Sequence, residues 1–225
     1  MKLRAEGVSR QYFRQGKGTN VFNALKETDL TLEEGVVTEV TGRSGSGKST
    51  LLNVCAGLLT PTTGKVFLGD TDLYAQEDAA RSRLRNESIG VIPQGQTGLR
   101  SLTVLENVLL PCVMYGIEGQ ETYAEELLEQ MDIAELRNAY PSELSGGEMR
   151  RLSIARALIR RPGILLADEP TGDLDDENTH IVLSLLRKCA DEGKAVLLVT
   201  HEAEAAAYAD RIYRMEKGVL TSQEG

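Results

Sequence analysis

The sequence predicts one α/β domain with a mostly parallel core sheet, an antiparallel β region near the N-terminus and a helical subdomain. Continuous apolar runs at 163–167 and 195–200 are typical of parallel strands that are buried on both faces. Patterns with helical spacing separate the apolar runs, and strands that alternate with helices favour a parallel sheet. Residues 1–35 instead alternate apolar and polar side chains, which indicates antiparallel strands.

The elements expected along the chain follow from the same patterns. A strand rich in β-branched residues at 36–41 precedes a helix at 48–58, and 66–68 is expected to be a further strand of the antiparallel region. A short core strand is expected at 89–92, after which apolar residues recur at helical spacing. The remaining expected elements are helices at 103–116, 121–131, 145–160 and 176–191, and core strands at 163–167 and 195–200.

Composition excludes several classes of function. The net charge of −9 and the pI near 4.9 argue against a protein that wraps nucleic acid, since such proteins have a basic surface. No apolar run approaches the length that crosses a bilayer, and residues 1–6 alternate in charge, unlike a signal peptide. Cys55, Cys112 and Cys189 have no metal-like spacing and are expected to be buried in a reducing cytosol.

A glycine-rich loop follows the strand at 36–41. Residues 42–49 match G-x-x-x-x-G-K-[ST], and a strand before and a helix after are the context that a phosphate-binding loop requires. Lys48 would contact the β- and γ-phosphates, Ser49 would ligate Mg²⁺, and Thr50 would lie near the α-phosphate. An ordinary strand-to-helix turn is the weaker alternative, because the motif is complete. The expected nucleotide-binding residues of this loop are Gly42, Ser44, Gly45, Ser46, Gly47, Lys48, Ser49 and Thr50.

Two carboxylates end the apolar strand at 163–167. Open α/β sheets bind ligands at the carboxyl ends of their strands, so Asp168 and Glu169 are expected at the same edge as the phosphate loop. Asp168 would hold the Mg²⁺ shell, and Glu169 would polarise the attacking water. A charged exit from a strand is common and is the alternative. The segment 170–175 that follows, together with the phosphate loop, favours the catalytic interpretation.

A second glycine pair opens the helix at 145–160. Ser145 and Glu148 have the spacing of a capping box, and Gly146 and Gly147 leave N–H groups of the first turn open to a phosphate. Taken alone, this pattern predicts only a helix cap, and the other motifs favour a ligand site. The inward face of the helix would consist of Met149, Leu152, Ala155, Leu158 and Ile159.

Together these motifs resemble those of ABC-type (ATP-binding cassette) ATPases, over essentially the whole chain. Residues 101–111 and 167–175 are further similar to the subgroup that serves lipoprotein release, macrolide or peptide export and antimicrobial-peptide resistance. The resemblance implies a P-loop NTPase fold and an ATP hydrolase that powers a membrane exporter or a mechanotransmission system. The motifs that match in order are Tyr12, the loop 42–50, Gln94, 144–148, 164–169 and His201.

The resemblance implies roles for residues outside the phosphate loop. Tyr12 would stack on adenine, with the neighbouring Phe13 as the alternative ring, and Asp175 would contact the partner subunit. Gln94 would contact Mg²⁺ or the lytic water, and it would also lie at the contact with a membrane subunit. His201 would hydrogen-bond the γ-phosphate. The segment that would meet the γ-phosphate of the opposite protomer is Ser145, Gly146, Gly147 and Glu148. The implied catalytic set is Glu169, His201, Gln94 and Lys48, and the implied magnesium set is Ser49, Gln94 and Asp168.

The resemblance also implies an organisation and partners. A nucleotide-binding core of about 1–94 and 161–225 would carry a helical subdomain of about 95–160. Two copies would lie head to tail with two ATP molecules between them, and integral membrane permease subunits would receive the motion. No nucleic-acid partner is expected. The protein would be cytoplasmic and peripheral on the inner face of the cell membrane.

Three positions depart from the family pattern. Glu148 stands where the family usually has Gln, Pro93 precedes Gln94 where relatives usually have an aromatic residue, and 95–98 is polar and glycine-bearing at the expected membrane contact. A soluble ABC-type ATPase that acts on ribosomes or DNA is the alternative from another class. Tandem cassettes, a long coiled coil or a basic arm would favour it, and the sequence has none of them. The segment 144–148 disfavours a P-loop kinase or GTPase.

Overall fold

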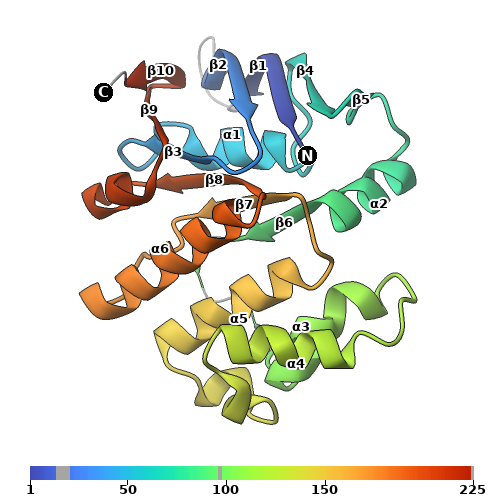
Figure 1. The fold of residues 1–225 in the computed structure, drawn as a ribbon. Helices are drawn as coiled ribbons and strands as arrows, with labels where there is room; N and C mark the ends of the chain where they lie inside the picture. Colours follow the sequence, from blue (N-terminus) through green and yellow to red (C-terminus); the bar gives the residue numbers. More distant parts are fainter. Residues whose placement is uncertain (14–20, 96–97, 224–225) are drawn as a thin grey trace.

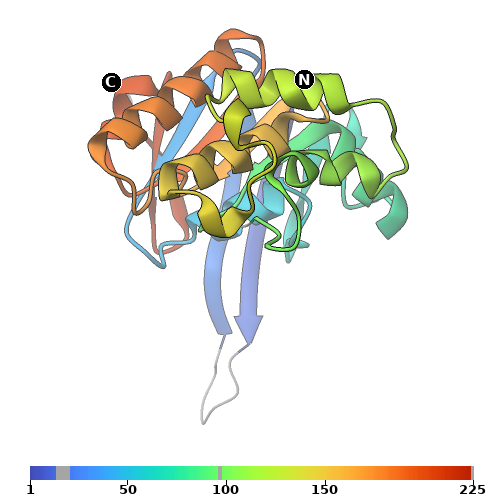
Figure 2. The same cartoon turned by 90° about the horizontal axis from the view of Figure 1, so that it is seen from below.

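The computed structural model describes residues 1–13, 21–95 and 98–223, whose strands form two sheets (Figure 1). The smaller sheet has the strand order β2-β1-β4-β5 and is antiparallel, as the N-terminal alternation predicts. β1 and β2 extend beyond the rest of the molecule as a ribbon (Figure 2). The strands of this sheet are β1 (Leu3–Phe13), β2 (Val21–Leu32), β4 (Thr63–Leu68) and β5 (Thr71–Asp72).

The larger sheet has the strand order β10-β9-β3-β8-β7-β6. Its pairings are parallel except between β9 and β10, so the mostly parallel core is confirmed. Because the carboxyl ends of parallel strands meet at one edge, the residues that follow β3, β7 and β8 lie close together. The strands are β3 (Val37–Thr41), β6 (Ile89–Ile92), β7 (Ile164–Asp168), β8 (Ala195–Thr200), β9 (Arg211–Glu216) and β10 (Val219–Gln223).

Helices cover both faces of the larger sheet. α1 (Lys48–Cys55) lies between the two sheets and shares one buried apolar cluster with both (Figure 1). On the opposite face, α5 and α6 pack on the sheet, and α3 and α4 pack against α5 in a second cluster. These helices are α3 (Val104–Val113), α4 (Glu121–Gln130), α5 (Gly146–Leu158) and α6 (Asp176–Asp191). Among the described residues, no helix combines the length and the apolar character that a membrane span needs.

Several elements differ from expectation. The helix expected at 48–58 is shorter and ends at Cys55. Leu58 is 55% exposed, so the apolar character of this residue did not indicate burial. α2 (Asp78–Ser88) was not expected, because it is polar on nearly all sides and buries only Ser88. The hairpin of β9 and β10 was also not expected, since Met215 is the only residue of the two strands that is buried.

The three cysteines are buried, as expected. Burial raises the pKa of the Cys189 thiol to about 11, and it raises the pKa of Cys55 to about 12. Reactive cysteines have lowered pKa values and some exposure. These thiols therefore serve as small apolar side chains in the core.

Glu39 is a buried carboxylate in the central strand β3. The side chain is 1% exposed, and its Oε2 has no hydrogen-bond partner in the described part of the chain. Burial raises the pKa of Glu39 above its ordinary value of 4.5. The unfolded chain therefore loses this proton at a lower pH than the folded protein does. The contribution of Glu39 to stability is full below pH 4.5 and is lost as the pH rises through the folded pKa.

Glu39→Gln is accordingly expected to stabilise the protein at pH 8 and to have little effect near pH 4.5. An amide stays neutral, so the variant avoids the cost of ionising a carboxyl group that is buried without a charged partner. Urea unfolding at the two pH values measures the difference in the free energy of unfolding. An equal difference at both pH values would contradict the assignment of the effect to ionisation.

Candidate nucleotide-binding and catalytic site

A cavity of about 370 Å³ lies at the carboxyl edge of the larger sheet. It brings together sequence-predicted residues from the antiparallel sheet, the phosphate loop and the ends of β6 and β7. The cavity is lined by Tyr12, Phe22, Ala24, Ser44, Gly45, Ser46, Gly47, Lys48, Ser49, Thr50, Gln94 and Glu169. The two rings from the β1–β2 ribbon and the phosphate loop therefore face one space, which suits a nucleotide with its base at one end and its phosphates at the other.

The phosphate loop is held between β2 and the end of β9. Gly47 has φ +115°, and a Cβ at this position would lie 2.4 Å from the carbonyl oxygen of Ala24. A Cβ on Gly42 would likewise lie 2.4 Å from the carbonyl oxygen of Met215. Close approach of the neighbouring backbones thus requires glycine at both ends of the loop.

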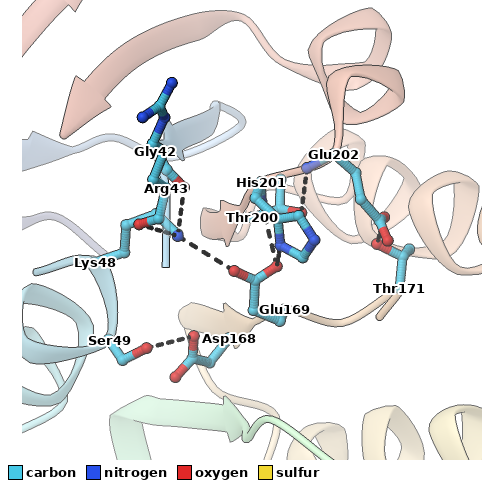
Figure 3. Close-up of polar contacts among 10 residues, drawn as sticks. All are labelled: Gly42, Arg43, Lys48, Ser49, Asp168, Glu169, Thr171, Thr200, His201 and Glu202. Atoms are coloured by element: carbon cyan, nitrogen blue, oxygen red, sulfur yellow. Dashed lines mark hydrogen bonds and ion pairs between the residues drawn. The ribbon is translucent and has the colours of Figure 1, made fainter. Parts of the chain in front are cut away.

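Lys48 is buried at the start of α1 and contacts three acceptors (Figure 3). Its Nζ donates to the carbonyl oxygens of Gly42 at 2.7 Å and Arg43 at 3.4 Å, and it lies 3.3 Å from Glu169 Oε1. The Lys48 side chain is 5% exposed, so the ion pair with Glu169 is shielded from water. The structure therefore places the expected phosphate ligand beside the expected catalytic carboxylate.

Asp168 and Ser49 form the second polar contact of the site. Ser49 Oγ donates to Asp168 Oδ1 at 3.0 Å (Figure 3). Burial is the main cause that raises the pKa of the Asp168 carboxyl, and the negative charge of Glu169 raises it further. The hydrogen bond from Ser49 and the positive charge of Lys48 lower this pKa in part. A hydroxyl and a carboxylate within hydrogen-bond distance are oxygen ligands that suit Mg²⁺.

The donor set is small for a cation held by protein alone. No group of three or more His, Cys, Asp or Glu side chains that could hold a metal occurs within residues 1–13, 21–95 and 98–223. Mg²⁺ usually binds through one or two protein oxygens and completes its shell with water and substrate phosphates. Ser49 and Asp168 fit that mode, in which the phosphates are part of the metal site.

Glu169 is held from two sides. Its Oε1 faces Lys48, and its Oε2 lies 2.9 Å from Nδ1 of His201 and accepts a bond from the His201 backbone N–H at 3.3 Å. Glu169 has φ +46°, a conformation that non-glycine residues seldom adopt and that occurs at functional sites. The strand order explains why Glu169 lies next to both Lys48 and His201. β8, which ends just before His201, lies between β3, which leads into the phosphate loop, and β7, which ends just before Glu169.

The Ser145 segment lies elsewhere in the chain's fold. Ser145 Oγ accepts from the Glu148 N–H at 3.3 Å, and Glu148 Oε2 accepts from the Ser145 N–H at 2.7 Å, so the predicted capping box is present. The bond from the Ser145 backbone is the main cause that lowers the pKa of Glu148. None of Ser145 to Glu148 lines the cavity. The sequence-predicted γ-phosphate contacts are therefore not brought to the phosphate loop of the same chain.

Gly147 has a steric role that the sequence did not indicate. A Cβ at this position would lie 2.1 Å from Asn178 Oδ1. Asn178 cannot easily give way, because its Nδ2 donates to both carboxylate oxygens of Asp175, at 2.9 and 3.1 Å. Gly147, in the first turn of α5, thus packs directly on the first turn of α6.

The two candidate adenine-stacking rings differ in placement. Tyr12 lines the cavity, and the Arg10 guanidinium lies 4.9 Å from the centre of its ring. Phe13 is 82% exposed and is not among the lining residues. Phe22, which sequence reasoning missed, pairs with Tyr12 across the ribbon and lines the cavity as well. The polar segment 95–98 includes residues 96 and 97, which lie outside the described residues.

Two further contacts were missed. Glu202 accepts a hydrogen bond from the Thr171 hydroxyl, which joins the loop after Glu169 to the loop after β8 (Figure 3). His180 is exposed, as expected, and its Nδ1 also lies 2.9 Å from the Tyr208 hydroxyl. Neither contact has a signal in the sequence, because both depend on how the helices and loops are arranged.

Comparison with known proteins agrees with this geometry. Residues 25–172 match the model of the ABC transporter family. The chain is 39% identical over 221 residues to the lipoprotein-releasing system ATP-binding protein LolD of Shewanella sp. (strain MR-4). The alignment covers 97% of this chain and 94% of the LolD protein. It is 37% identical over 210 residues to the LolD protein of Saccharophagus degradans, with 92% of each chain covered.

Solved structures give the same result. The bacterial ABC transporter cassette MJ0796, in a dimeric structure, is 33% identical with a TM-score of 0.88, and the match covers 99% of both chains. A dimeric post-hydrolysis state of MJ0796 bound to ADP and Pi matches equally well. These matches, the phosphate loop and the Lys48–Glu169–His201 arrangement agree: the chain belongs to the ABC transporter family and is an ATP-binding and ATP-hydrolysing transporter subunit.

Proposed function

We propose that this ATPase subunit powers lipoprotein release from a membrane. The support for this cargo is the similarity to LolD proteins over nearly the whole chain. The observation that carries the ATPase chemistry is the cavity in which Tyr12, the phosphate loop, Gln94 and Glu169 face one another. No observation favours the alternative, a soluble ABC-type ATPase that acts on ribosomes or DNA. The net charge of −9 disfavours binding to nucleic acid.

The residues that line the cavity, together with Asp168 and His201, which contact Ser49 and Glu169, divide the work of hydrolysis. Tyr12 stacks on adenine, the N–H groups of the phosphate loop bind the phosphate oxygens, and Lys48 neutralises the β- and γ-phosphates. Ser49, Asp168 and Gln94 would hold Mg²⁺, and the ion would supply positive charge to offset the charge that develops on the phosphates. Glu169 takes a proton from the attacking water, and His201 hydrogen-bonds the γ-phosphate.

A second copy of the chain completes the site. Ser145 to Glu148 do not line the cavity of their own chain, and Ser145 and Gly146 are exposed at the N-terminus of α5, where backbone N–H groups can bind an anion. In a head-to-tail pair, this segment would meet the γ-phosphate bound to the other copy, and Asp175 would lie at the contact. The dimeric form of MJ0796 supports an arrangement of two cassettes.

Membrane subunits would receive the motion. We propose that residues 1–94 and 161–225 act as the nucleotide-binding core and that 95–160 move as a helical subdomain. A groove of about 450 Å³ between α2, β6, α3 and α5 presents exposed Leu58, Leu99 and Met114. The groove combines these apolar side chains with polar ones such as Arg85 and Asn86, and exposed apolar side chains gathered in a groove suit a contact with an integral membrane permease. The protein would then be cytoplasmic and peripheral on the inner face of the membrane.

Co-purification tests this proposal. Affinity-tagged Glu169→Gln would be expressed in the native cell, the membranes solubilised gently, and the complex purified with ATP and Mg²⁺ for mass spectrometry. We expect a stoichiometric multi-span membrane protein with an extracytoplasmic domain that binds lipoprotein. An untagged strain is the control. Recovery from the soluble fraction with ribosomal or DNA-repair proteins would overturn the transport proposal and leave the ATPase assignment intact.

A further inference from the structure

Arg150 joins α5 to the loop that carries Gln94. Its Nη1 donates to the carbonyl oxygen of Pro93 at 3.0 Å and lies 3.4 Å from that of Gly95. These two carbonyls belong to the residues on either side of Gln94, so one guanidinium nitrogen spans the backbone of the loop. Arg150 lies two residues after Glu148, in the second turn of the helix that Ser145 caps.

The environment of Arg150 favours a fixed side chain. The residue is 6% exposed, and a buried guanidinium must have its donors satisfied. Burial lowers the pKa of Arg150, and the charges of Asp173 and Glu202 act in the opposite direction. Within the described residues, it forms no ion pair with a carboxylate. Its hydrogen bonds therefore go to the loop carbonyls, while distant carboxylates offset its charge.

The two carboxylates whose charges act on Arg150 belong to loops at the catalytic edge. Asp173 lies in the loop after Glu169, and Glu202 follows His201 and accepts from Thr171. Gln94 itself is exposed toward the cavity that Glu169, Lys48 and Ser49 line. Arg150 is thus placed between the helix that begins at Ser145 and the side of the cavity where Mg²⁺ and water would be bound.

We propose that Arg150 is a positioning residue that makes the placement of Gln94 depend on the placement of α5. This inference rests on the proposed function, in which Gln94 contacts Mg²⁺ and Ser145 to Gly147 contact the ATP of a second copy. When α5 shifts to engage that ATP, the loop 93–95 moves with it, because Arg150 hydrogen-bonds both carbonyls. Gln94 reaches its working position only when α5 has done so.

The test is a double-mutant cycle with Arg150→Met and Gln94→Ala. Met keeps an unbranched apolar stem and removes the donors. We expect Arg150→Met to lower kcat at saturating ATP and to raise the Mg²⁺ concentration for half-maximal hydrolysis, each by about tenfold or more, as for other residues that orient metal ligands. Binding of a fluorescent ATP analogue and the midpoint of thermal unfolding should change little. Arg150→Lys, which keeps a cationic donor, should recover part of kcat.

The cycle separates coupling from a general structural role. If Arg150 acts through Gln94, Arg150→Met will have no further effect on kcat or on the Mg²⁺ requirement in the Gln94→Ala background. Additive effects would overturn the proposal, and so would equal losses of analogue binding and thermal stability. Arg137→Gln is the matched control, because it removes an arginine that is 46% exposed and pairs with Glu125 of α4. Wild-type turnover measured beside the variants tests the ATPase assignment separately.

Discussion

Glu169→Gln is expected to lower the rate of ATP hydrolysis by about a hundredfold to ten-thousandfold, the usual contribution of a general base. The amide cannot accept the proton of the attacking water. It keeps the shape of the side chain and can still hydrogen-bond His201, which lies 2.9 Å away. ATP binding should therefore survive, and the variant should accumulate as an ATP-bound dimer. Phosphate release measures the first effect, and size-exclusion chromatography with and without ATP measures the second.

A surface carboxylate provides the matched control for this change. Glu125→Gln also removes one negative charge, but Glu125 is 43% exposed and pairs only with Arg137 in the described structure. That variant should hydrolyse ATP at the normal rate, because a surface ion pair contributes little. Near-normal hydrolysis by Glu169→Gln would show that another group activates the water.

Lys48→Ala is expected to weaken ATP binding by about tenfold to a hundredfold, since a charge-assisted hydrogen bond to phosphate contributes about 1.5–3 kcal/mol. The same change removes a buried cation that lies 3.3 Å from Glu169. Turnover should fall as well, because neutralisation of the γ-phosphate is lost. Equilibrium binding of a fluorescent ATP analogue measures the first effect.

Combining the two substitutions distinguishes their roles. Glu169→Gln alone should trap a dimer with ATP, whereas Lys48→Ala with Glu169→Gln should stay monomeric at the same ATP concentration. Lys65→Ala serves as the control, because the Lys65 side chain is 64% exposed and forms a surface ion pair with Asp72. If the double variant dimerised as readily as Glu169→Gln, Lys48 would not be a principal phosphate ligand.

The sequence predicts those helices and strands whose own residues carry an apolar run or a local capping pattern. β6 and β7 are short apolar runs, and the Ser145 capping box is a local pattern that forms as its spacing predicts. α2 was not predictable in this way, because it buries only Ser88 and has no apolar stripe. The hairpin of β9 and β10 likewise lacks a buried apolar pattern. Its close approach to Gly42 of the phosphate loop involves the backbone of Met215, not a side chain.

The site was predictable as a set of residues but not as a set of contacts. Motifs placed Lys48, Asp168, Glu169 and His201 at one sheet edge. The contacts of Glu169 with both Lys48 and His201 depend on β8 lying between β3 and β7, and strand order is not a property of any local segment. The bonds from Arg150 to the loop of Gln94 have the same origin, since 57 residues separate Arg150 from Pro93.

The contact between Lys48 and Glu169 has a consequence for the order of events in the catalytic cycle. An ammonium has three N–H donors, and Lys48 already has three acceptors within 3.4 Å. A phosphate oxygen must therefore replace one of them, and the carboxylate is the acceptor that an arriving anion repels. We therefore expect bound nucleotide to separate Glu169 from Lys48. Under the proposed mechanism, Glu169 would then be free to accept a proton from water only when a nucleotide is bound.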